Sequence, residues 1–343
     1  MRFILSLILK PLSIGYGLIV YIRHWLYDRG FLASYTFDTP IIKIGNLSFG
    51  GTGKSPMTIF LANYFKEKYE VNIVSRGYGR STKGLQQVYQ ESKADDVGDE
   101  PLMIKRNCVN SNVFVCEDRV SIIQKITKQL NIIKIIILDD ALQHRRLKSG
   151  FQILLTDYNA LFFDDSLFPL GKLRDIKSRA SLADAIIVTK SKSRDEVTIS
   201  KIKKYSNAPI FFSQIEYLDY LDYFQNSKVK LNQKVILVSA IANISLFKIE
   251  IKRNAQVQNE FSYRDHYRFK IKDVNDWIND CHELQITQIV TTEKDAVKLL
   301  DFKDIFIQNQ IQLVVLPIQV QMTEEDKNML FTLIENYIQE FEN

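Results

Sequence analysis

The stretch IGNLSFGGTGKS, residues 44–55, decides the fold. It lies between a predicted strand at 41–44 and a predicted helix at 56–69, which is the strand–loop–helix context of a Walker A phosphate loop. Its glycines allow backbone N–H groups to converge on phosphate, Lys54 can neutralise the β- and γ-phosphates, and the Ser55 hydroxyl can bind Mg²⁺. The predicted nucleotide-phosphate site comprises Ser48, Phe49, Gly50, Gly51, Thr52, Gly53, Lys54 and Ser55.

One position of this loop departs from the strict pattern. Ser48 stands six residues before Lys54, where the pattern has its first glycine. Pro56 follows in the first helical turn, where its missing N–H costs little. The alternative interpretation is a glycine-rich turn that carries an incidental lysine.

Short apolar runs on both sides of the loop predict the rest of the sheet. They are nearly continuous in apolar residues, as strands covered by helices on both faces must be. The predicted strands are residues 41–44, 71–75, 113–116, 135–138, 153–156 and 185–189. Because longer mixed segments separate them, we predict an α/β fold of the P-loop NTPase type, with a doubly wound, mainly parallel sheet.

A second series of strands predicts a second, smaller α/β domain. Its strands are expected at 235–239, 289–292 and 313–316, with a capped terminal helix at 323–341. The Tyr- and Asp-rich segment between the two series lacks a clear helical period and is expected to be a linker. The predicted domains are residues 1–30 (an N-terminal membrane-associated helical segment), 31–216 (the P-loop core), 217–230 (the linker) and 231–343.

The N-terminal segment has the character of an interfacial helix. Its apolar runs at 3–9 and 12–22 are broken by Lys10 and Pro11, so neither a signal peptide nor a spanning helix fits the pattern well. Arginines and aromatic residues alternate with these runs, as expected for contact with an anionic membrane surface. The alternative is a helical hairpin buried on the protein itself.

The composition excludes several classes of protein. Lys and Arg exceed Asp and Glu by only 45 to 40, so no nucleic-acid partner is expected. Cys108, Cys116 and Cys281 form no CxxC pair and leave an odd number, which argues against a disulfide framework or a structural zinc site. No obligate protein partner is evident from the sequence.

Candidate acids and cations lie in loops at predicted strand ends. Asp139 and Asp140 end an apolar strand, as in a Walker B element, and could hold Mg²⁺. Further candidates are Asp99 and Glu100 in a Gly-Asp-Glu-Pro turn, the histidines His144 and His266, and the possible phosphate ligands Arg76, Arg119 and Arg174. From the residues alone, each of these has an ordinary surface or turn interpretation too.

Taken together, these motifs resemble the tetraacyldisaccharide 4′-kinase family along most of the chain. The matching stretches are residues 45–56, 75–80, 97–101, 139–144, 168–174, 265–267 and 292–296. The family's own phosphate loop also lacks the first Walker glycine. The resemblance implies ATP- and Mg²⁺-dependent phosphorylation of the 4′-hydroxyl of an acylated glucosamine disaccharide 1-phosphate in lipid A biosynthesis. It also implies a peripheral or monotopic protein at the cytoplasmic face of the bacterial inner membrane.

The resemblance also assigns roles. It implies that Asp99 is the catalytic base and His266 its partner, and that Ser55, Glu100, Asp139 and Asp140 serve the metal. Arg76, Arg119, Gln143, His144 and Arg174 would contact phosphate or substrate. Two positions depart from the family: Ala141 replaces a usual glycine, which would be strained at positive φ, and Asp175 replaces the commoner glutamate.

Two other functions remain possible from the sequence. A P-loop GTPase or metal-insertion NTPase would read its base with an Asn/Thr-Lys-x-Asp motif, which residues 188–192 match only in part because the aspartate is missing. A nucleotide-binding peripheral membrane scaffold without turnover is the second alternative. The paired acids and Lys54 count against it.

Overall fold

The protein is described by a computed structural model covering residues 2–128, 134–148 and 150–342, with the backbone alone for residues 2–8. It divides into two compact units. The first comprises Met1–Arg76, Asn110–Ile215 and Val320–Asn343, and the second comprises Gly77–Val109 and Glu216–Gln319.

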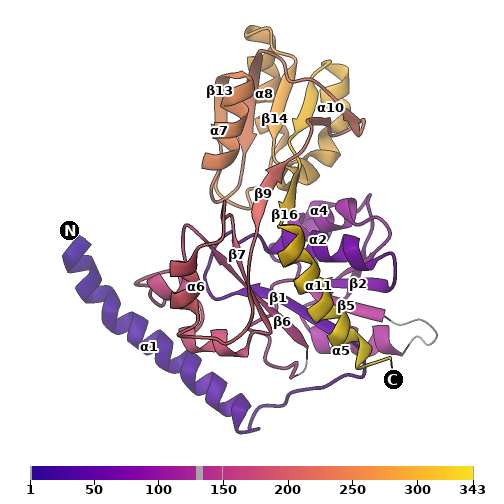
Figure 1. The fold of residues 1–343 in the computed structure, drawn as a ribbon. Helices are drawn as coiled ribbons and strands as arrows, with labels where there is room; N and C mark the ends of the chain where they lie inside the picture. The colour runs from indigo at the N-terminus through magenta and orange to yellow at the C-terminus, as the bar shows by residue number, and fades with distance from the viewer. Residues whose placement is uncertain (1, 129–133, 149, 343) are drawn as a thin grey trace. The chain divides into compact units, whose positions relative to one another are not determined.

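The first unit is built on a parallel sheet (Figure 1). Within this unit the strands run in the order β4–β2–β5–β1–β6–β7–β8, and all neighbours in this order are parallel. The strands are β1 (Ile41–Asn46), β2 (Glu70–Ser75), β4 (Asn112–Val115), β5 (Lys134–Leu138), β6 (Phe151–Asp157), β7 (Ala185–Thr189) and β8 (Ile210–Phe212). All six strands predicted for this sheet are confirmed; β8 was not predicted.

Helices cover this sheet. They are α2 (Lys54–Phe65), α5 (Arg119–Thr127), α6 (Glu196–Ile202), α11 (Glu324–Gln339) and the 3₁₀ turns η1 (Phe162–Asp164) and η2 (Lys177–Leu182). The strand residues between them, such as Ile42, Ile137 and Ile187, are fully buried. Parallel strands with helices on both faces bury both sets of side chains, which explains their apolar sequences.

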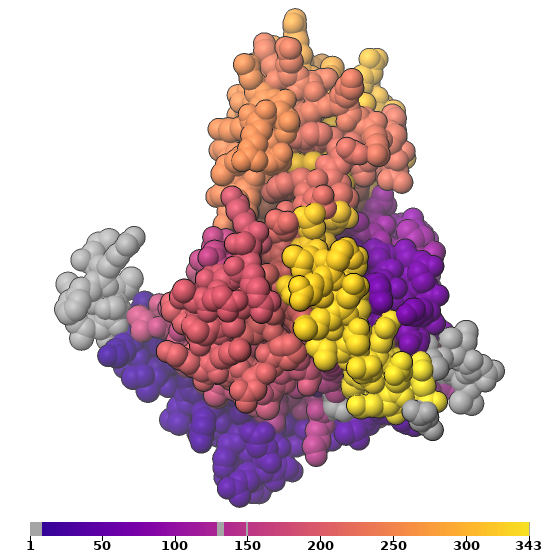
Figure 2. All heavy atoms as spheres, in the orientation of Figure 1, coloured from indigo at the N-terminus to yellow at the C-terminus, as the bar shows by residue number. Residues whose placement is uncertain are grey.

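The terminal helix α11 returns to the first unit, although sequence analysis placed it in the second domain. Its predicted cap is confirmed, since the Thr323 hydroxyl accepts a hydrogen bond from the Asp326 N–H. Phe331 stacks on Tyr64 of α2, with ring centroids 3.5 Å apart. The Tyr337 hydroxyl accepts a hydrogen bond from the Ile41 N–H of β1. Figure 2 shows α11, in yellow, on the surface of this unit.

A single long helix, α1 (Arg2–Asp28), replaces the interrupted segment expected at the N-terminus, with Pro11 inside it. Its buried positions include Ser13 and His24, while Leu18 and Ile19 are 58% and 67% exposed. α1 is therefore a continuous helix with one face on the first unit, and not a buried hairpin. Among the described residues, no helix has the length and apolar character needed to cross a membrane.

The second unit contains a mixed sheet in the order β11–β10–β15–β14–β12–β13. The strands are β10 (Leu221–Asp222), β11 (Ser227–Lys228), β12 (Lys234–Ser239), β13 (Gln256–Ser262), β14 (Gln288–Thr291) and β15 (Gln312–Val315). Its other elements are β3 (Gln86–Val88), α3 (Ala94–Val97), α4 (Asp99–Asn107), α7 (Ser245–Asn254), α8 (Ile271–Glu283), α9 (Glu293–Ala296), η3 (Val297–Phe302) and α10 (Lys303–Gln308). Trp277 of α8 is fully buried at the centre, and its indole N–H donates to the Tyr263 hydroxyl.

The structure corrects the predicted domain boundaries for two segments. Residues 77–109, assigned to the P-loop core, belong to the second unit. The expected linker at 217–230 supplies β10 and β11 to the sheet, because Tyr217 and Tyr220 pack on a core cluster there. The chain enters the second unit after Ile215 and leaves it after Gln319. These two positions lie in β9 (Gln214–Tyr217) and β16 (Ile318–Gln321), which pair with each other.

Candidate active site

The phosphate loop leaves β1 and enters α2, as the sequence predicts. Gly53 is the N-cap of α2 and has φ of +83°, a left-handed conformation that side chains rarely adopt. The first N–H groups of a helix lack intrahelical partners, so the start of α2 suits an anion. The Lys54 ammonium lies 3.9 Å from an Asp140 oxygen. The loop therefore places the N-terminus of α2 and a lysine at the carboxyl end of the sheet.

Two residues at the end of β7, Thr189 and Lys190, hold this loop through hydrogen bonds to its carbonyl groups. The Lys190 ammonium donates to the Gly51 carbonyl and to Asp157, both at 2.6 Å, and the Thr189 hydroxyl donates to the Thr52 carbonyl at 3.0 Å. Sequence analysis considered residues 188–192 only as an incomplete base-reading motif. Their place at this edge is consistent with the predicted parallel sheet, because the carboxyl ends of parallel strands lie at the same edge.

Asp139 and Asp140 follow β5 at that same edge. Asp139 is buried, with the hydroxyls of Thr58 and Ser75 each 3.4 Å from its carboxylate. Asp140 has φ of +49° and is held by both terminal nitrogens of Arg174. Burial alone would raise the pKa of Asp140, but the Arg174 hydrogen bonds and the Lys54 charge outweigh it and lower the pKa to about 2. Both carboxylates are therefore placed at the phosphate loop's edge of the sheet.

The side chains of Arg119 and Gln143 donate hydrogen bonds to backbone carbonyls of the loops at this edge of the sheet. Arg119 is 4% exposed, and its terminal nitrogens donate to the carbonyls of Asp139 and Asp140 at 2.7 and 2.9 Å. The Gln143 amide donates to the Asn46 carbonyl at 2.8 Å. Arg119 is thus already occupied by the backbone of the paired acids.

The other residues of the first unit that the sequence singled out, Arg76, His144 and Ala141, differ in how far they are buried. Arg76 is exposed at the end of β2. His144 follows the paired acids; burial and the nearby Arg119 charge lower its pKa to about 4, so it is neutral at pH 7. Ala141 is buried and is not strained, because the positive φ falls on Asp140 before it.

The second departure, Asp175, forms a buried pair with α1. Its carboxylate lies 2.6 Å from His24 Nε2, and both side chains are less than 5% exposed. One residue earlier, the Arg174 carbonyl accepts a hydrogen bond from the Tyr16 hydroxyl. At Gly17, a β-carbon would come within 2.8 Å of Leu167, so α1 packs closely here. α1 therefore contacts the backbone of Arg174, whose side chain binds Asp140.

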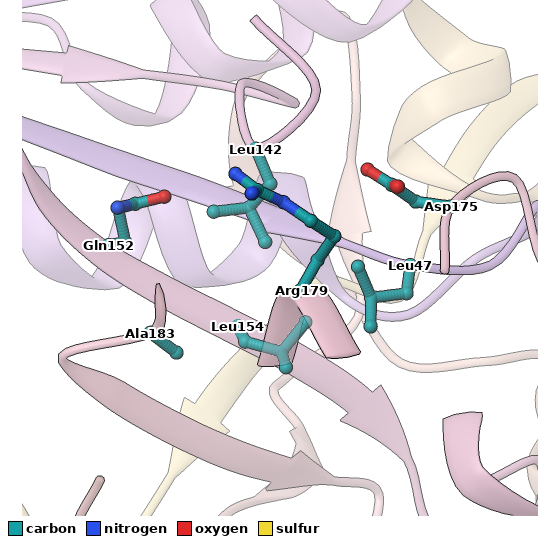
Figure 3. Close-up of a pocket in the computed structure, with 7 residues that line it drawn as sticks. All are labelled: Leu47, Leu142, Gln152, Leu154, Asp175, Arg179 and Ala183. Carbon is teal, nitrogen blue, oxygen red and sulfur yellow. The ribbon is translucent and has the colours of Figure 1, made fainter. Parts of the chain in front are cut away.

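Figure 3 shows the small cavity beside this contact, lined in part by Asp175, Arg179, Leu47 and Leu142. Its volume is about 10 Å³, which is room for about one water molecule. The region between β6 and the Asp175 loop is therefore closely packed and is not a substrate pocket.

Asp99 and His266, which the sequence placed in different domains, lie together in the second unit. Gly98 has φ of +95°, and a β-carbon there would lie 3.3 Å from Pro101. This turn starts α4, so that Asp99 Oδ1 accepts a hydrogen bond from the Glu100 N–H at 3.0 Å. Asp99 Oδ2 lies 3.0 Å from His266 Nδ1. The two predicted catalytic side chains are therefore in direct contact.

The contact changes the acidity of both groups. Burial alone would raise the pKa of Asp99, but the hydrogen bond from His266 and the Lys294 charge lower it. The Asp99 hydrogen bond raises the pKa of His266, against the opposing effects of burial and Lys294. Side-chain exposure is 8% for Asp99 and 30% for His266, so the imidazole is the more accessible partner.

Glu100, expected to serve the metal, has a cationic partner in the same unit. Its carboxylate lies 3.0 Å from the Lys294 ammonium. Sequence analysis gave Lys294 no role, although its place in a matching motif was a signal. Among the described residues, no group of three or more His, Cys, Asp and Glu side chains is arranged to hold a metal ion.

Comparison with known proteins gives consistent matches over nearly the whole chain. A sequence model of the family described as tetraacyldisaccharide-1-P 4′-kinase matches residues 5–339. The tetraacyldisaccharide 4′-kinase of Flavobacterium johnsoniae is 35% identical over 346 residues, covering 98% of each chain. That of Cytophaga hutchinsonii is 36% identical over 301 residues, covering 86% of each. The crystal structure of LpxK from Aquifex aeolicus in complex with ATP is similar, with a TM-score of 0.76 and 27% identity, covering 97% of this chain and 99% of that one.

Proposed function

Because the chain belongs to the tetraacyldisaccharide-1-P 4′-kinase family, we propose that it transfers the γ-phosphate of ATP to the 4′-hydroxyl of a tetraacylated glucosamine disaccharide 1-phosphate. The observation that carries this proposal is the family match over residues 5–339. The matches to kinases, which cover 86% and 98% of this chain, leave no reason to retain the GTPase or scaffold alternatives.

On the donor side, we propose that residues 48–55 bind the ATP phosphates and that Ser55, Asp139 and Asp140 hold Mg²⁺. The residues fit the ion, since hydroxyl and carboxylate oxygens are the ligands Mg²⁺ prefers. Bound Mg²⁺ would neutralise charge that develops on the phosphates during transfer. Arg174 supports this arrangement by fixing Asp140, and Arg119 by fixing the backbone of both acids.

On the acceptor side, we propose that Asp99 and His266 act together as the base. A lowered pKa makes Asp99 alone a weak base, whereas a raised pKa and greater exposure suit His266 to remove a proton. This refines the assignment suggested by resemblance, in which Asp99 itself was the base. Glu100 then serves to hold Lys294 and is not proposed as a metal ligand.

We further propose that α1 brings the enzyme to an anionic membrane at the cytoplasmic face of the inner membrane. Leu12, Ile14, Leu18, Ile19 and Ile22 are between 46% and 67% exposed. Apolar side chains on one face of a helix favour burial at the lipid interface. A tetraacylated substrate favours the same location, since each methylene removed from lipid costs about 0.8 kcal/mol.

The direct test is a phosphate-transfer assay with purified protein. The protein is incubated with γ-labelled ATP, Mg²⁺ and tetraacyldisaccharide 1-phosphate in detergent, and label is measured in the lipid extract. We expect labelled lipid that requires Mg²⁺ and is not formed from γ-labelled GTP at a comparable rate. Release of inorganic phosphate with no label in the lipid would refute the proposal.

A further inference from the structure

The start of α9 is firmly held inside the second unit. The Thr292 hydroxyl accepts a hydrogen bond from the Asp295 N–H, and the fully buried Asp295 carboxylate accepts one from the Ala240 N–H at 2.9 Å. Glu293 accepts a hydrogen bond from the Asn107 amide of α4. The residues on either side of Lys294 therefore fix the position of its backbone.

From this position Lys294 reaches the Asp99–His266 pair. Its ammonium nitrogen lies 3.0 Å from Glu100, 3.4 Å from Asp265 Oδ1, 3.4 Å from His266 Nε2 and 4.0 Å from Asp99 Oδ2. The side chain is only 17% exposed. Burial would lower the pKa of Lys294, but the charges of Glu100, Asp99 and Asp265 prevail and raise it, so the ammonium ion persists.

The chemistry of the ammonium ion determines which imidazole nitrogen carries the proton. An ammonium group has three donors and no acceptor. A nitrogen that faces it at hydrogen-bond distance is stabilised as an acceptor, and the proton then resides on the other nitrogen. For His266, Nε2 is left unprotonated and Nδ1–H donates to Asp99.

We infer that Lys294 is a positioning residue that keeps His266 in the Nδ1–H form, with the Nε2 lone pair available to the acceptor hydroxyl. This inference rests on the proposed function, because the available lone pair matters only if His266 receives a proton. The groups that face His266 are Asp99 from α4, Lys294 from α9, Asp265 from its own turn and the Tyr78 ring, whose centroid is 5.6 Å away.

In the transfer step, the substrate hydroxyl replaces Lys294 at Nε2. Its O–H bond breaks, the proton bonds to Nε2, and the oxygen forms a bond to the γ-phosphorus. The bond from the γ-phosphorus to the bridging oxygen breaks, and ADP leaves with that electron pair. Asp99 and Asp265 stabilise the imidazolium, whereas Lys294 destabilises it. Lys294 therefore favours release of the proton from His266 Nε2 to water, which restores the neutral imidazole.

The test combines histidine ¹⁵N NMR with the pH profile of kcat/KM in Lys294→Met, Lys294→Arg and the wild type. The chain has four histidines, so His266→Gln assigns the signals of interest. At a pH where His266 is neutral, we expect an unprotonated Nε2 in the wild type and in Lys294→Arg. In Lys294→Met, we expect a protonated Nε2 near neutral pH and an acid limb of kcat/KM shifted upward by about one pH unit. Lys303→Met, which removes a charge from an exposed position of the same unit, should change neither.

Unchanged ¹⁵N signals and an unmoved acid limb in Lys294→Met would overturn the inference, even if activity fell equally at every pH. If Lys294→Met does not fold, Lys294→Arg decides, since a neutral His266 that carries its proton on Nε2 in that variant would also contradict the inference. The NMR measurement needs no substrate. A wild-type protein that forms no labelled lipid would instead refute the proposed function.

Discussion

Replacing Asp99 by asparagine should remove the base while leaving the protein folded. Asp99 Oδ1 accepts from the Glu100 N–H, and Oδ2 lies 3.0 Å from His266 Nδ1. If the asparagine oxygen keeps the Glu100 contact, its NH₂ group faces Nδ1, which must then become the acceptor. The proton moves to Nε2, and His266 can no longer accept one from the substrate.

The expected loss in kcat is about 10²–10⁴-fold, the usual contribution of a general base, or about 3–5 kcal/mol of transition-state stabilisation. A wrong tautomer imposed by an Asp-to-Asn change has an effect at the upper end of this range in a Ser-His-Asp triad. ATP affinity should change less than about twofold, because Asp99 and the phosphate loop belong to different units.

The assay measures label transferred from ATP to lipid in detergent, together with ATP affinity by calorimetry. Asp96→Asn, which makes the same charge change in the neighbouring helix α3, is the matched control and should retain full activity. A kcat for Asp99→Asn within about tenfold of the wild type would refute the assignment of the pair as the base. A large loss of ATP affinity in Asp99→Asn would show that the substitution disturbs nucleotide binding and does not act on the base alone.

Lys54→Ala should weaken ATP binding and lower kcat together, because in the proposed function Lys54 would contact phosphate in both the ground and transition states; calorimetry and turnover check this. Arg174→Lys should lower kcat at least about tenfold, since lysine cannot grip both carboxylate oxygens of Asp140; a wild-type rate would contradict it. The folded pKa of Asp140 is about 2 against 3.8 ordinarily, so its stabilisation is complete above about pH 4 and lost as the pH falls through about 2. Asp140→Asn should therefore show a shallower loss of stability in that range, measured by denaturant unfolding. Leu18→Glu with Ile19→Glu should abolish binding to anionic vesicles in a flotation assay and leave activity in detergent within about twofold; unaltered flotation would exclude this face.

The six predicted strands of the large sheet could be found because each is a nearly continuous apolar run. β2 illustrates this, since Val71, Ile73 and Val74 are all buried. β13 was not predicted, because it lies at the sheet edge with a largely polar sequence, and only one neighbour pairs with it. Local periodicity therefore finds the centre of a sheet and misses its edges.

Sequence analysis found the parts of the candidate site that are contiguous in sequence and missed those that depend on tertiary contacts. The phosphate loop could be found because its residues are contiguous and their chemistry is specific. That Asp99 and His266 belong to one unit could not be found, because 167 residues separate them in sequence. Lys294 and the His24–Asp175 pair were missed because each acts through tertiary partners that no local pattern encodes.

The contacts of α1 limit how the exposed apolar face of this helix can be altered. Deleting the helix would remove hydrogen-bond partners of Arg174, Asp175 and Leu167, and with them support for the loop whose Arg174 side chain binds Asp140. A variant with a more polar α1 must instead keep Ser13, Tyr16, Gly17 and His24, and substitute only the side chains that face away from the protein. The helix that presents an apolar face to solvent also packs on the first unit with its other face, so it can be resurfaced but not removed.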